Sequence, residues 1–185
     1  MKKSDFTPHI RLCTPEDLDD IMDLQERICA SMPRPDLFVA TCREENASYL
    51  AEPNVIFGTY DHDRLIAYAS LAFPEKASDN LGWDLGWDED TVRRCAKLDT
   101  IVVDPAYRGY GLQRTLISHC LSYAKAPDPD CFVLTTVSPA NTYSLRNVQS
   151  EGFQILKRMT KYGGRDRYVL GYHASGHFPE IYPHP

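Results

Sequence analysis

The chain has 185 residues, of which 43% are hydrophobic and 25% are charged, and its formal net charge is −6. This length fits one domain, and the hydrophobic share excludes a wholly disordered chain. With 20 basic against 26 acidic residues, the chain lacks the concentrated positive charge that nucleic-acid binding requires. Its longest uncharged apolar run, residues 65–73, is shorter than a membrane span. We therefore expect neither nucleic acid nor a membrane as a partner.

The N-terminus and the cysteines indicate the compartment. Lys2 and Lys3 are not followed by an apolar stretch, so we expect no secretory signal. The six cysteines, scattered from Cys13 to Cys131, form no C-x-x-C pair. This distribution is typical of reduced thiols rather than of a disulfide framework or a zinc site. The expected localisation is cytoplasmic, and we expect no metal.

Hydrophobic periodicity and turn residues predict the elements. In chain order they are a strand at 9–12, a helix at 14–30, a helix from about 36 to 52, a strand at 54–61, a strand at 64–73, a loop at 74–94 with a helical turn near 88–94, a strand at 95–103, a helix at 112–125, a strand at 132–137, a helix at 141–151, and a hairpin of 153–162 and 167–172. Thr14 and Pro15 begin the first helix, and Gly152 ends the last.

This order predicts an α+β fold with a mixed sheet. The apolar strands at 95–103 and 132–137 are joined by a helix, as in a right-handed parallel crossover. We expect one domain over residues 1–173. A tail over residues 174–185, which contains three prolines, is expected either to lie over the surface or to be loose.

The most informative segment runs from Val103 to Gln113, where a buried strand ends and a helix begins. Between them Pro105 turns the chain, and Gly109 and Gly111 let the backbone approach a ligand closely. A helix N-terminus after such a turn presents unpaired N–H groups and a positive dipole to an anion. The nucleotide P-loop pattern is absent. The segment therefore predicts an anion-binding loop of another kind.

The pattern Val103-x-Pro105-x-x-Arg108-Gly109-x-Gly111 resembles motif A of the GNAT N-acetyltransferase superfamily, whose loop binds the pyrophosphate of acetyl-CoA. Residues 141–153, an Asn-led helix that ends in Gly-Phe, are similar to the family's next motif. The resemblance implies a GNAT-like mixed, mostly antiparallel central sheet flanked by helices, with splayed central strands holding acetyl-CoA. It also implies an N-acetyltransferase that moves the acetyl group to a primary amine of a small molecule, peptide or protein by direct attack.

The resemblance assigns cofactor-binding roles residue by residue. The matched positions are Ile101, Val102 and Val103 on the strand, Arg108, Gly109, Tyr110, Gly111, Leu112 and Gln113 in the loop, and Asn141 and Ser144 on the later helix. Three positions depart from the family. Gln113 replaces the final Gly or Ala of the loop, Val148 replaces a tyrosine that protonates the leaving thiolate, and Thr136 replaces a glutamate. The proton-transfer groups therefore have to be sought elsewhere.

Asp99 is the candidate general base. Two-residue alternation predicts that one face of its strand carries Lys97, Asp99, Ile101 and Val103. Asp99 is the only carboxylate among them, and amine acetylation needs a group that removes a proton from the acceptor. The alternative is a structural acid paired with Lys97 or Arg94.

Tyr143 is the candidate general acid, with Ser144 beside it. Ser144 shares a helical face with Val148, whereas Tyr143 is rotated off that face and has a longer reach. The alternative is that Ser144 caps the helix or contacts the cofactor while Tyr143 packs. His119, in the helix after the loop, is expected to be a packed or edge residue.

Three further points stay open. The acidic stretch with Trp83 and Trp87 forms either part of an acceptor pocket or a surface loop docked through its tryptophans. Arg165 and Arg167 lie at the place where the resemblance implies an acceptor site. A non-catalytic acyl-CoA-binding or regulatory module is the alternative function, and a homodimer is left open.

Overall fold

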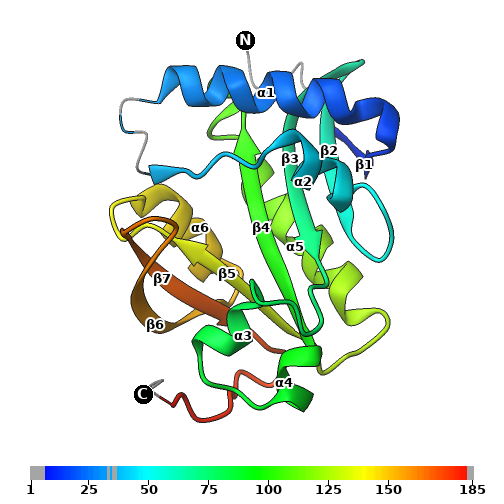
Figure 1. The fold of residues 1–185 in the computed structure, drawn as a ribbon. Helices are drawn as coiled ribbons and strands as arrows, with labels where there is room; N and C mark the ends of the chain where they lie inside the picture. Colours follow the sequence, from blue (N-terminus) through cyan, green and yellow to red (C-terminus); the bar gives the residue numbers. More distant parts are fainter. Residues whose placement is uncertain (1–6, 33, 35–36, 183–185) are drawn as a thin grey trace.

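The computed structural model describes residues 7–32, 34 and 37–182. Within these residues one sheet is flanked by helices (Figure 1). The strands are β1 (His9–Leu12), β2 (Val55–Asp61), β3 (Arg64–Ala72), β4 (Cys95–Val103), β5 (Phe132–Val137), β6 (Gln154–Lys161) and β7 (Arg165–Tyr172). The helices are α1 (Leu18–Ser31), α2 (Arg43–Tyr49), α3 (Leu81–Asp84), α4 (Glu89–Arg93), α5 (Leu112–Lys125) and α6 (Thr142–Ser150). Short 3-10 turns precede α1 and α5 at Pro15–Asp17 and Pro105–Tyr107.

The seven strands form one sheet in the order β1-β2-β3-β4-β5-β7-β6. β4 and β5 are parallel, and every other neighbouring pair is antiparallel. The predicted crossover from residues 95–103 to 132–137 through a helix is therefore confirmed. So is the predicted α+β fold with a mostly antiparallel sheet.

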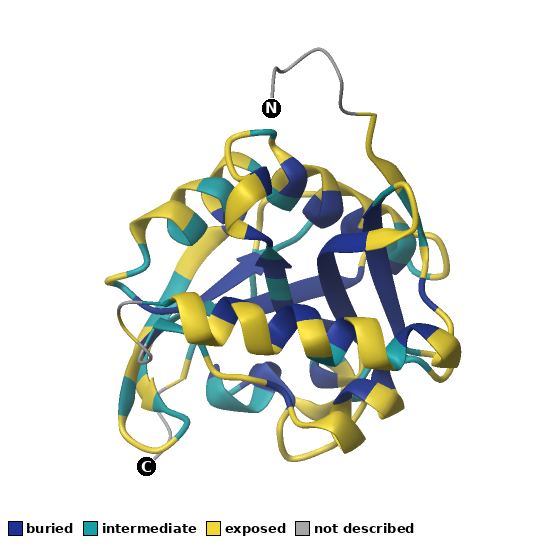
Figure 2. Ribbon diagram, turned by 90° about the horizontal axis from the view of Figure 1, so that it is seen from above, coloured by how far each residue is buried: buried dark blue, intermediate teal, exposed yellow. Residues whose placement is uncertain are grey.

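Helices cover both faces of this sheet (Figure 1). On one face α1 and α2 bury a core around Ile21, Leu24 and Tyr68. On the other face α5 buries Leu116 and Ile117 against the larger core. Figure 2 shows the resulting layers, with buried strands between helices whose outer sides are exposed. Within the described residues, no helix combines the length and apolar character that a membrane crossing needs.

The prediction of helix before residue 43 is wrong where the structure describes the chain. Its expected start near Asp36 lies outside the described residues, and residues 38–42 are not helical. The main chain of Thr41 instead bonds to a side chain of α1: Gln25 Nε2 donates to Thr41 O at 2.7 Å, and Thr41 N donates to Gln25 Oε1 at 3.1 Å. Because both main-chain groups of Thr41 are used in this way, the helix begins only at Arg43.

The predicted long loop at 74–94 contains two short helices, α3 and α4, of which α4 matches the helical turn expected near 88–94. Each has a capping side chain, because Asn80 accepts from Gly82 N and Asp88 accepts from Thr91 N, both at 2.9 Å. Trp87 is buried, and its ring centroid lies 5.1 Å from that of Phe132.

The described part of the tail packs on this region. The Phe178 ring stacks on Trp87 at 6.5 Å, and Tyr182 N donates to Leu85 O at 3.2 Å. Phe178 also belongs to the apolar cluster that contains Leu85 and Trp87. The described part of the tail therefore lies over the surface of α3 and α4, which is the first of the two alternatives that the sequence left open.

Candidate active site

A cleft of about 220 Å³ opens where β4 and β5 diverge. The two strands pair through Cys95, Ala96 and Lys97 of β4. Just beyond, Thr135 Oγ1 of β5 donates to Leu98 O of β4 at 2.7 Å, so a side chain continues the link for one residue after the backbone pairing ends. The walls come from β4, β5, α6, the segment 37–41 and the end of the β6–β7 hairpin. The lining residues are Leu37, Phe38, Val39, Ala40, Thr41, Glu45, Lys97, Asp99, Thr100, Ile101, Thr135, Thr136, Val137, Ser138, Asn141, Ser144, Val148, Tyr162 and Arg167.

A β-bulge in β4 shapes this cleft. Leu98 pairs with Leu71 and Ile101 pairs with Ala69, so β4 has one more residue than β3 between these two pairs. Ser70 lies opposite the extra residue, and its Oγ accepts from Thr100 N at 3.1 Å. An extra residue in one strand shifts the alternation of side chains beyond it.

The prediction that Lys97, Asp99, Ile101 and Val103 share one face is therefore wrong. Ile101 and Val103 pack with the core on the α5 side, whereas Val102 packs with the core on the α1 side. Lys97 lies before the bulge and Asp99 lies within it, and their side chains form an ion pair. Strict alternation fails because the bulge reverses the faces between Asp99 and Ile101.

Lys97 and Asp99 form an ion pair inside the cleft. Lys97 Nζ lies 2.8 Å from Asp99 Oδ1 and 3.2 Å from Asp79 Oδ2, and the lysine is only 6% exposed. Burial by itself lowers the pKa of Lys97, but the charge and the hydrogen bond of Asp99, with smaller contributions from Tyr162 and Asp79, raise that pKa above its usual range. Lys97 is therefore an ammonium ion between two carboxylates, and the group carries a net negative charge.

Hydroxyl groups connect Asp99 to the wall formed by residues 37–41. Thr100 Oγ1 donates to Asp99 Oδ2 at 3.2 Å and lies 2.9 Å from Thr41 Oγ1. Gln25 holds the main chain of Thr41 and accepts from Tyr68 Oη at 3.1 Å. This buried network fixes the wall relative to β4, and with it the side chain of Asp99.

The glycine-containing loop lies between β4 and α5. Gly109 and Gly111 have φ values of 84° and 78°, a left-handed conformation that favours glycine. A Cβ added at either glycine would meet no atom within 4 Å, so the space above both is open. Gly111 is also the N-cap of α5, which directs the first N–H groups of that helix into this space. The arrangement suits an anion such as a pyrophosphate.

Two contacts anchor this loop to the β2–β3 hairpin. Arg64 Nη2 donates to Asp104 Oδ2 at 2.9 Å, and Tyr107 Oη donates to Asp61 Oδ2. Asp104 also accepts from Ala106 N at 3.0 Å. The loop is therefore held in shape without a ligand.

Gln113 connects the start of α5 to α6. Its Nε2 donates to Ser144 Oγ at 3.1 Å, and its Oε1 accepts from Asn147 Nδ2 at 2.7 Å. Asn141, the N-cap of α6, accepts from Ser144 N through Oδ1 at 3.2 Å. The side chain at the position where the resemblance expects Gly or Ala thus joins the two helices that flank the cleft.

A profile of the acetyltransferase (GNAT) family matches residues 18–153, which include the glycine-containing loop, α5, α6 and all of the cleft lining except Tyr162 and Arg167. The chain belongs to this family. It is therefore an acetyltransferase. Comparison with curated protein sequences gives no significant match.

Solved structures of GNAT proteins share the fold. A putative acetyltransferase from Salmonella typhimurium with its cofactor acetyl-CoA is 17% identical, with a TM-score of 0.67, 96% of this chain and 98% of that chain covered. NAA60 from Arabidopsis thaliana in complex with acetyl-CoA is 18% identical, with a TM-score of 0.68 and coverage of 91% and 99%. The ribosomal-protein-S18-alanine N-acetyltransferase from Escherichia coli is 19% identical, with a TM-score of 0.68 and coverage of 95% and 99%. At these identities the likeness establishes the fold alone.

The structure places the GNAT-derived candidates unevenly around the cleft. Asp99, Ile101, Asn141 and Ser144 line it. Tyr143 is 82% exposed and lies outside the lining. The remaining loop candidates Arg108, Gly109, Tyr110, Gly111, Leu112 and Gln113 belong to the segment that leads from β4 into α5. The geometry thus does not favour Tyr143 as the acid.

Tyr162 is the residue that sequence reasoning missed. It lies between β6 and β7, lines the cleft, and accepts from Thr136 Oγ1 through its hydroxyl at 3.4 Å. Thr136 is the position where some GNAT members have a glutamate, so a proton donor from another element lies beside it. Tyr162 directly precedes the predicted turn at Gly163 and Gly164. Its neighbours in the sequence do not indicate that it lies in the cleft.

The other candidates lie away from the cleft lining. The Trp83 and Trp87 side chains pack in the apolar cluster under α3 and α4, so the docked surface loop, rather than an aromatic acceptor wall, is what the structure shows. His119 packs its ring on Phe57 at 5.6 Å, as expected of an edge residue.

Proposed function

We propose that this enzyme transfers the acetyl group of acetyl-CoA to a primary amine by direct attack. The observation that carries the proposal is the divergence of β4 and β5 beyond Lys97, with Asp99 on the open wall and the Gly109–Gly111 loop at the start of the adjoining helix. Two structures of the same fold bind acetyl-CoA, which supports it as the acetyl donor.

The chain offers a separate binding group for each part of acetyl-CoA. The N–H groups at the start of α5, with Arg108 beside them, suit the pyrophosphate. The main chain of Ile101, Val102 and Val103 lies on the edge of β4 that turns away from β5, so it can bond to the pantetheine arm. Asn141 and Ser144 line the opposite wall, where their polar side chains can contact the same arm.

The proposed reaction needs one base and one acid. The acceptor ammonium loses one proton to Asp99, directly or through water, and the neutral amine attacks the thioester carbon to form the N–C bond. The nitrogen then loses its second proton to water. The carbonyl oxygen takes up the negative charge, which main-chain N–H groups of β4 can stabilise. The C–S bond then breaks, and the thiolate takes a proton from Tyr162 or from water. Amide and free thiol are the products.

The decisive test measures thiol release from acetyl-CoA with panels of amines, polyamines, amino acids and peptides, and identifies the acetylated product by mass spectrometry. We expect amine-dependent thiol release that is at least about tenfold slower in Asp99→Asn. Tight binding of CoA without thiol release from any amine would overturn the proposed reaction.

A further inference from the structure

Two threonines link Asp99 to the wall formed by residues 37–41. Thr100 follows Asp99 on β4, and Thr41 is the last residue of that wall. Both threonines are buried, and both line the cleft. The proposed reaction gives neither of their hydroxyl groups a role.

The two hydroxyl groups donate in one direction only. Thr100 Oγ1 donates to Asp99 Oδ2 at 3.2 Å, and a hydroxyl has a single proton. Thr100 therefore has no proton left for Thr41 Oγ1, which lies 2.9 Å away, so Thr41 is the donor in that pair. The chain of hydrogen bonds runs from Thr41 through Thr100 to Asp99, and each bond polarises the next.

The bulge in β4 makes the bond between Thr100 and Asp99 possible. In a regular strand the side chains of consecutive residues point to opposite faces. Here the two side chains bond to each other, because β4 has one extra residue between Leu98 and Ile101. Ser70 Oγ accepts from Thr100 N at 3.1 Å and fixes the backbone at this point. Thr100 is thereby held where its hydroxyl reaches Asp99.

Thr41 is fixed through its main chain. Gln25 of α1 donates to Thr41 O and accepts from Thr41 N. Gln25 in turn accepts from Tyr68 Oη of β3, and both of these side chains are buried. The first donor of the hydroxyl chain is therefore anchored to a helix and to the sheet.

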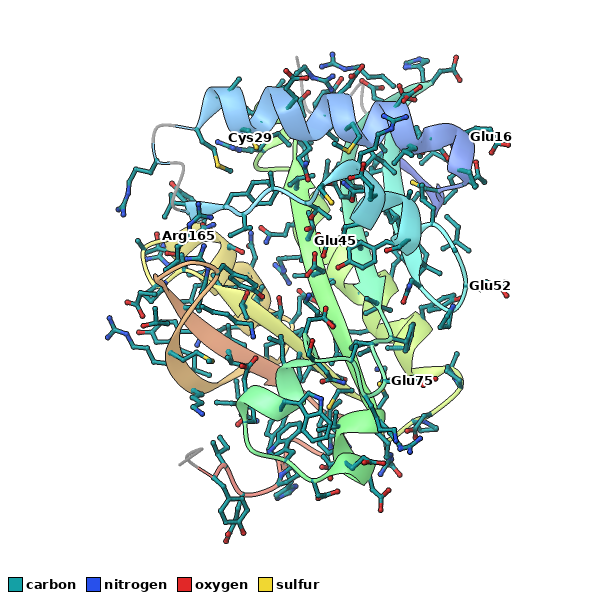
Figure 3. The ribbon with its side chains drawn as sticks, in the orientation of Figure 1. Glu16, Cys29, Glu45, Glu52, Glu75 and Arg165 are labelled. Atoms are coloured by element: carbon teal, nitrogen blue, oxygen red, sulfur yellow. The ribbon has the colours of Figure 1, made fainter. Side chains whose placement is uncertain are left out.

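The rest of the wall is held at its other end. Arg165 Nη1 of the β6–β7 hairpin donates to Phe38 O at 3.4 Å. Figure 3 shows Arg165 on this side of the cleft and Glu45 of α2, the helix that follows the wall, in front of β4. Because the wall and Asp99 line the same cleft, an acceptor that reaches Asp99 also meets the wall.

Asp99 needs a partner on each carboxylate oxygen to keep one orientation. Its Oδ1 lies 2.8 Å from Lys97 Nζ, and its Oδ2 accepts from Thr100 Oγ1. With Lys97 alone, the carboxylate would be free to rotate and to turn both oxygens toward the ammonium. Each carboxylate oxygen accepts two hydrogen bonds, so both oxygens keep a free site for the acceptor. A base held in this way lies within reach of the proton that it removes.

Building on the proposed function, in which Asp99 is the base, we propose that Thr100 and Thr41 are positioning residues for the reaction. Their one-way chain of hydroxyl hydrogen bonds holds the Asp99 carboxylate toward the acceptor nitrogen. The orientation of the base thus depends on the wall that the acceptor meets.

Substitutions of the same shape test the hydroxyl groups, with thiol release measured on the most active amine of the panel. We expect Thr100→Val to lower kcat about tenfold, and no more than Asp99→Asn does, because the base loses its orientation. KM for acetyl-CoA and CoA affinity should be unchanged. Thr41→Val should lower kcat about threefold, since it acts one bond further away. Thr100→Ser and Thr41→Ser should keep at least about half of the parent kcat, because they retain the hydroxyl.

A double variant separates positioning from stability. Thr100→Val leaves the Thr41 hydroxyl buried without its acceptor, which lowers stability, whereas replacing both hydroxyls by methyl groups removes that loss. We therefore expect Thr41→Val combined with Thr100→Val to regain the thermal midpoint of the parent and to keep the low kcat of Thr100→Val. Recovery of kcat together with the midpoint would show that the hydroxyls only fasten the wall, and would overturn the inference.

Two further comparisons serve as controls. Thr59→Val removes a buried hydroxyl of β2 that has no hydrogen-bond partner among the described residues, and it should leave kcat within about twofold of the parent. In the Asp99→Asn background, Thr100→Val should have no further effect on kcat, because a positioning residue acts only through the group that it positions. A further loss in that background would give Thr100 another role and overturn the inference.

The remaining outcomes separate this inference from the proposed function. A parent-like kcat in folded Thr100→Val, with Asp99→Asn impaired, would overturn the positioning role while the role of Asp99 stands. If Thr100→Val does not fold, equal kcat in Thr41→Val and Thr41→Ser would overturn it instead. A parent-like kcat in Asp99→Asn would overturn the role of Asp99 and this inference, and no thiol release with any amine would overturn the proposed reaction as well.

Discussion

Lys97 Nζ and Asp99 Oδ1 lie 2.8 Å apart on β4, at the point where the strand leaves its partner β5. Lys97 is buried and remains an ammonium, because burial lowers its pKa by less than the charge and hydrogen bond of Asp99, with Tyr162 and Asp79, together raise that pKa. Without Asp99, the buried Lys97 ammonium would have the more exposed carboxylate of Asp79 as its remaining ion-pair partner. The lysine therefore positions Asp99 in the cleft.

Asp99→Asn should lower kcat by about ten- to ten-thousandfold with little change in CoA affinity, because a general base is lost while the shape of the side chain is kept. Steady-state thiol release and CoA titration measure the two effects. Asp79→Asn is the matched control: its exposed carboxylate contacts the same lysine at 3.2 Å, and its loss should have little effect on kcat. If Asp99→Asn turns over at the parent rate, Asp99 is a structural acid.

Much of the scaffold could be predicted because its signals are local. The strands at 95–103 and 132–137 are rich in apolar and β-branched residues, and the loop between Val103 and Gln113 places its glycines directly before an amphipathic helix. Capping and turn chemistry fix such elements within a few residues. The parallel crossover then follows from a general rule of chain connection.

The cleft was harder to predict because its groups come from segments far apart in sequence. The bulge that reverses the faces of β4 depends on Ser70 of the neighbouring strand. Tyr162 and Arg167 enter the cleft only because β7 pairs with β5 and brings the last hairpin beside it. The non-helical segment before α2 depends on the bonds between Gln25 and Thr41. No periodicity within one segment encodes these contacts.

We expect the parent protein to bind CoA with a micromolar or lower dissociation constant, and we expect Gly111→Val to abolish this binding. Gly111 has a φ of 78° at the N-cap of α5, and a β-branched side chain there strains the backbone and fills the open space in which we place the pyrophosphate. Isothermal titration with CoA measures the loss.

Gly176→Val is the control for backbone strain. Gly176 has a similar φ of 71°, but it lies in the tail. This variant should lose stability without losing CoA affinity. Unchanged CoA affinity in folded Gly111→Val would refute the assignment of the loop.

Tyr162→Phe should lower kcat by about tenfold, whereas Tyr143→Phe should leave it within about twofold. The Tyr162 hydroxyl lies in the cleft beside Thr136, and Tyr143 is directed to solvent. The effect is modest because a coenzyme thiol, with a pKa near the 8.5 of a cysteine thiol, leaves readily even without an acid. Pre-steady-state thiol release between pH 6 and 10 measures it. A larger loss in Tyr143→Phe, with CoA affinity intact, would restore Tyr143 as the acid.

The charge of Asp17 stabilises the fold. Asp17 lies at the start of α1, on the opposite side of the molecule from α3 and α4 (Figure 1). This buried carboxylate accepts from Arg11 Nη2 and Nη1 at 2.7 and 2.8 Å, from Thr14 N at 2.8 Å and from Tyr60 Oη at 3.0 Å. The hydrogen bond from Arg11 is the main reason that the pKa of Asp17 lies well below its usual range. Three of these bonds join the start of α1 to β1 and β2, and the bond from Thr14 N caps the 3-10 turn that precedes α1.

Asp17→Asn should lower the free energy of unfolding by about 2 kcal/mol at pH 7, since the amide cannot replace a carboxylate bonded to a guanidinium. A carboxyl whose pKa is depressed by folding stabilises the native state above its unfolded pKa, about 3.9, and this contribution is lost as the pH falls toward the folded pKa. The difference in the free energy of unfolding between the parent and Asp17→Asn should therefore become smaller below about pH 4. Urea unfolding at pH 7, 5 and 3.5 measures it. Asp19→Asn, which removes an exposed carboxylate paired with Arg43, should cost less than about 0.5 kcal/mol at pH 7. A difference for Asp17→Asn that stays constant down to pH 3.5 would show that packing, and not the charge of Asp17, accounts for the loss.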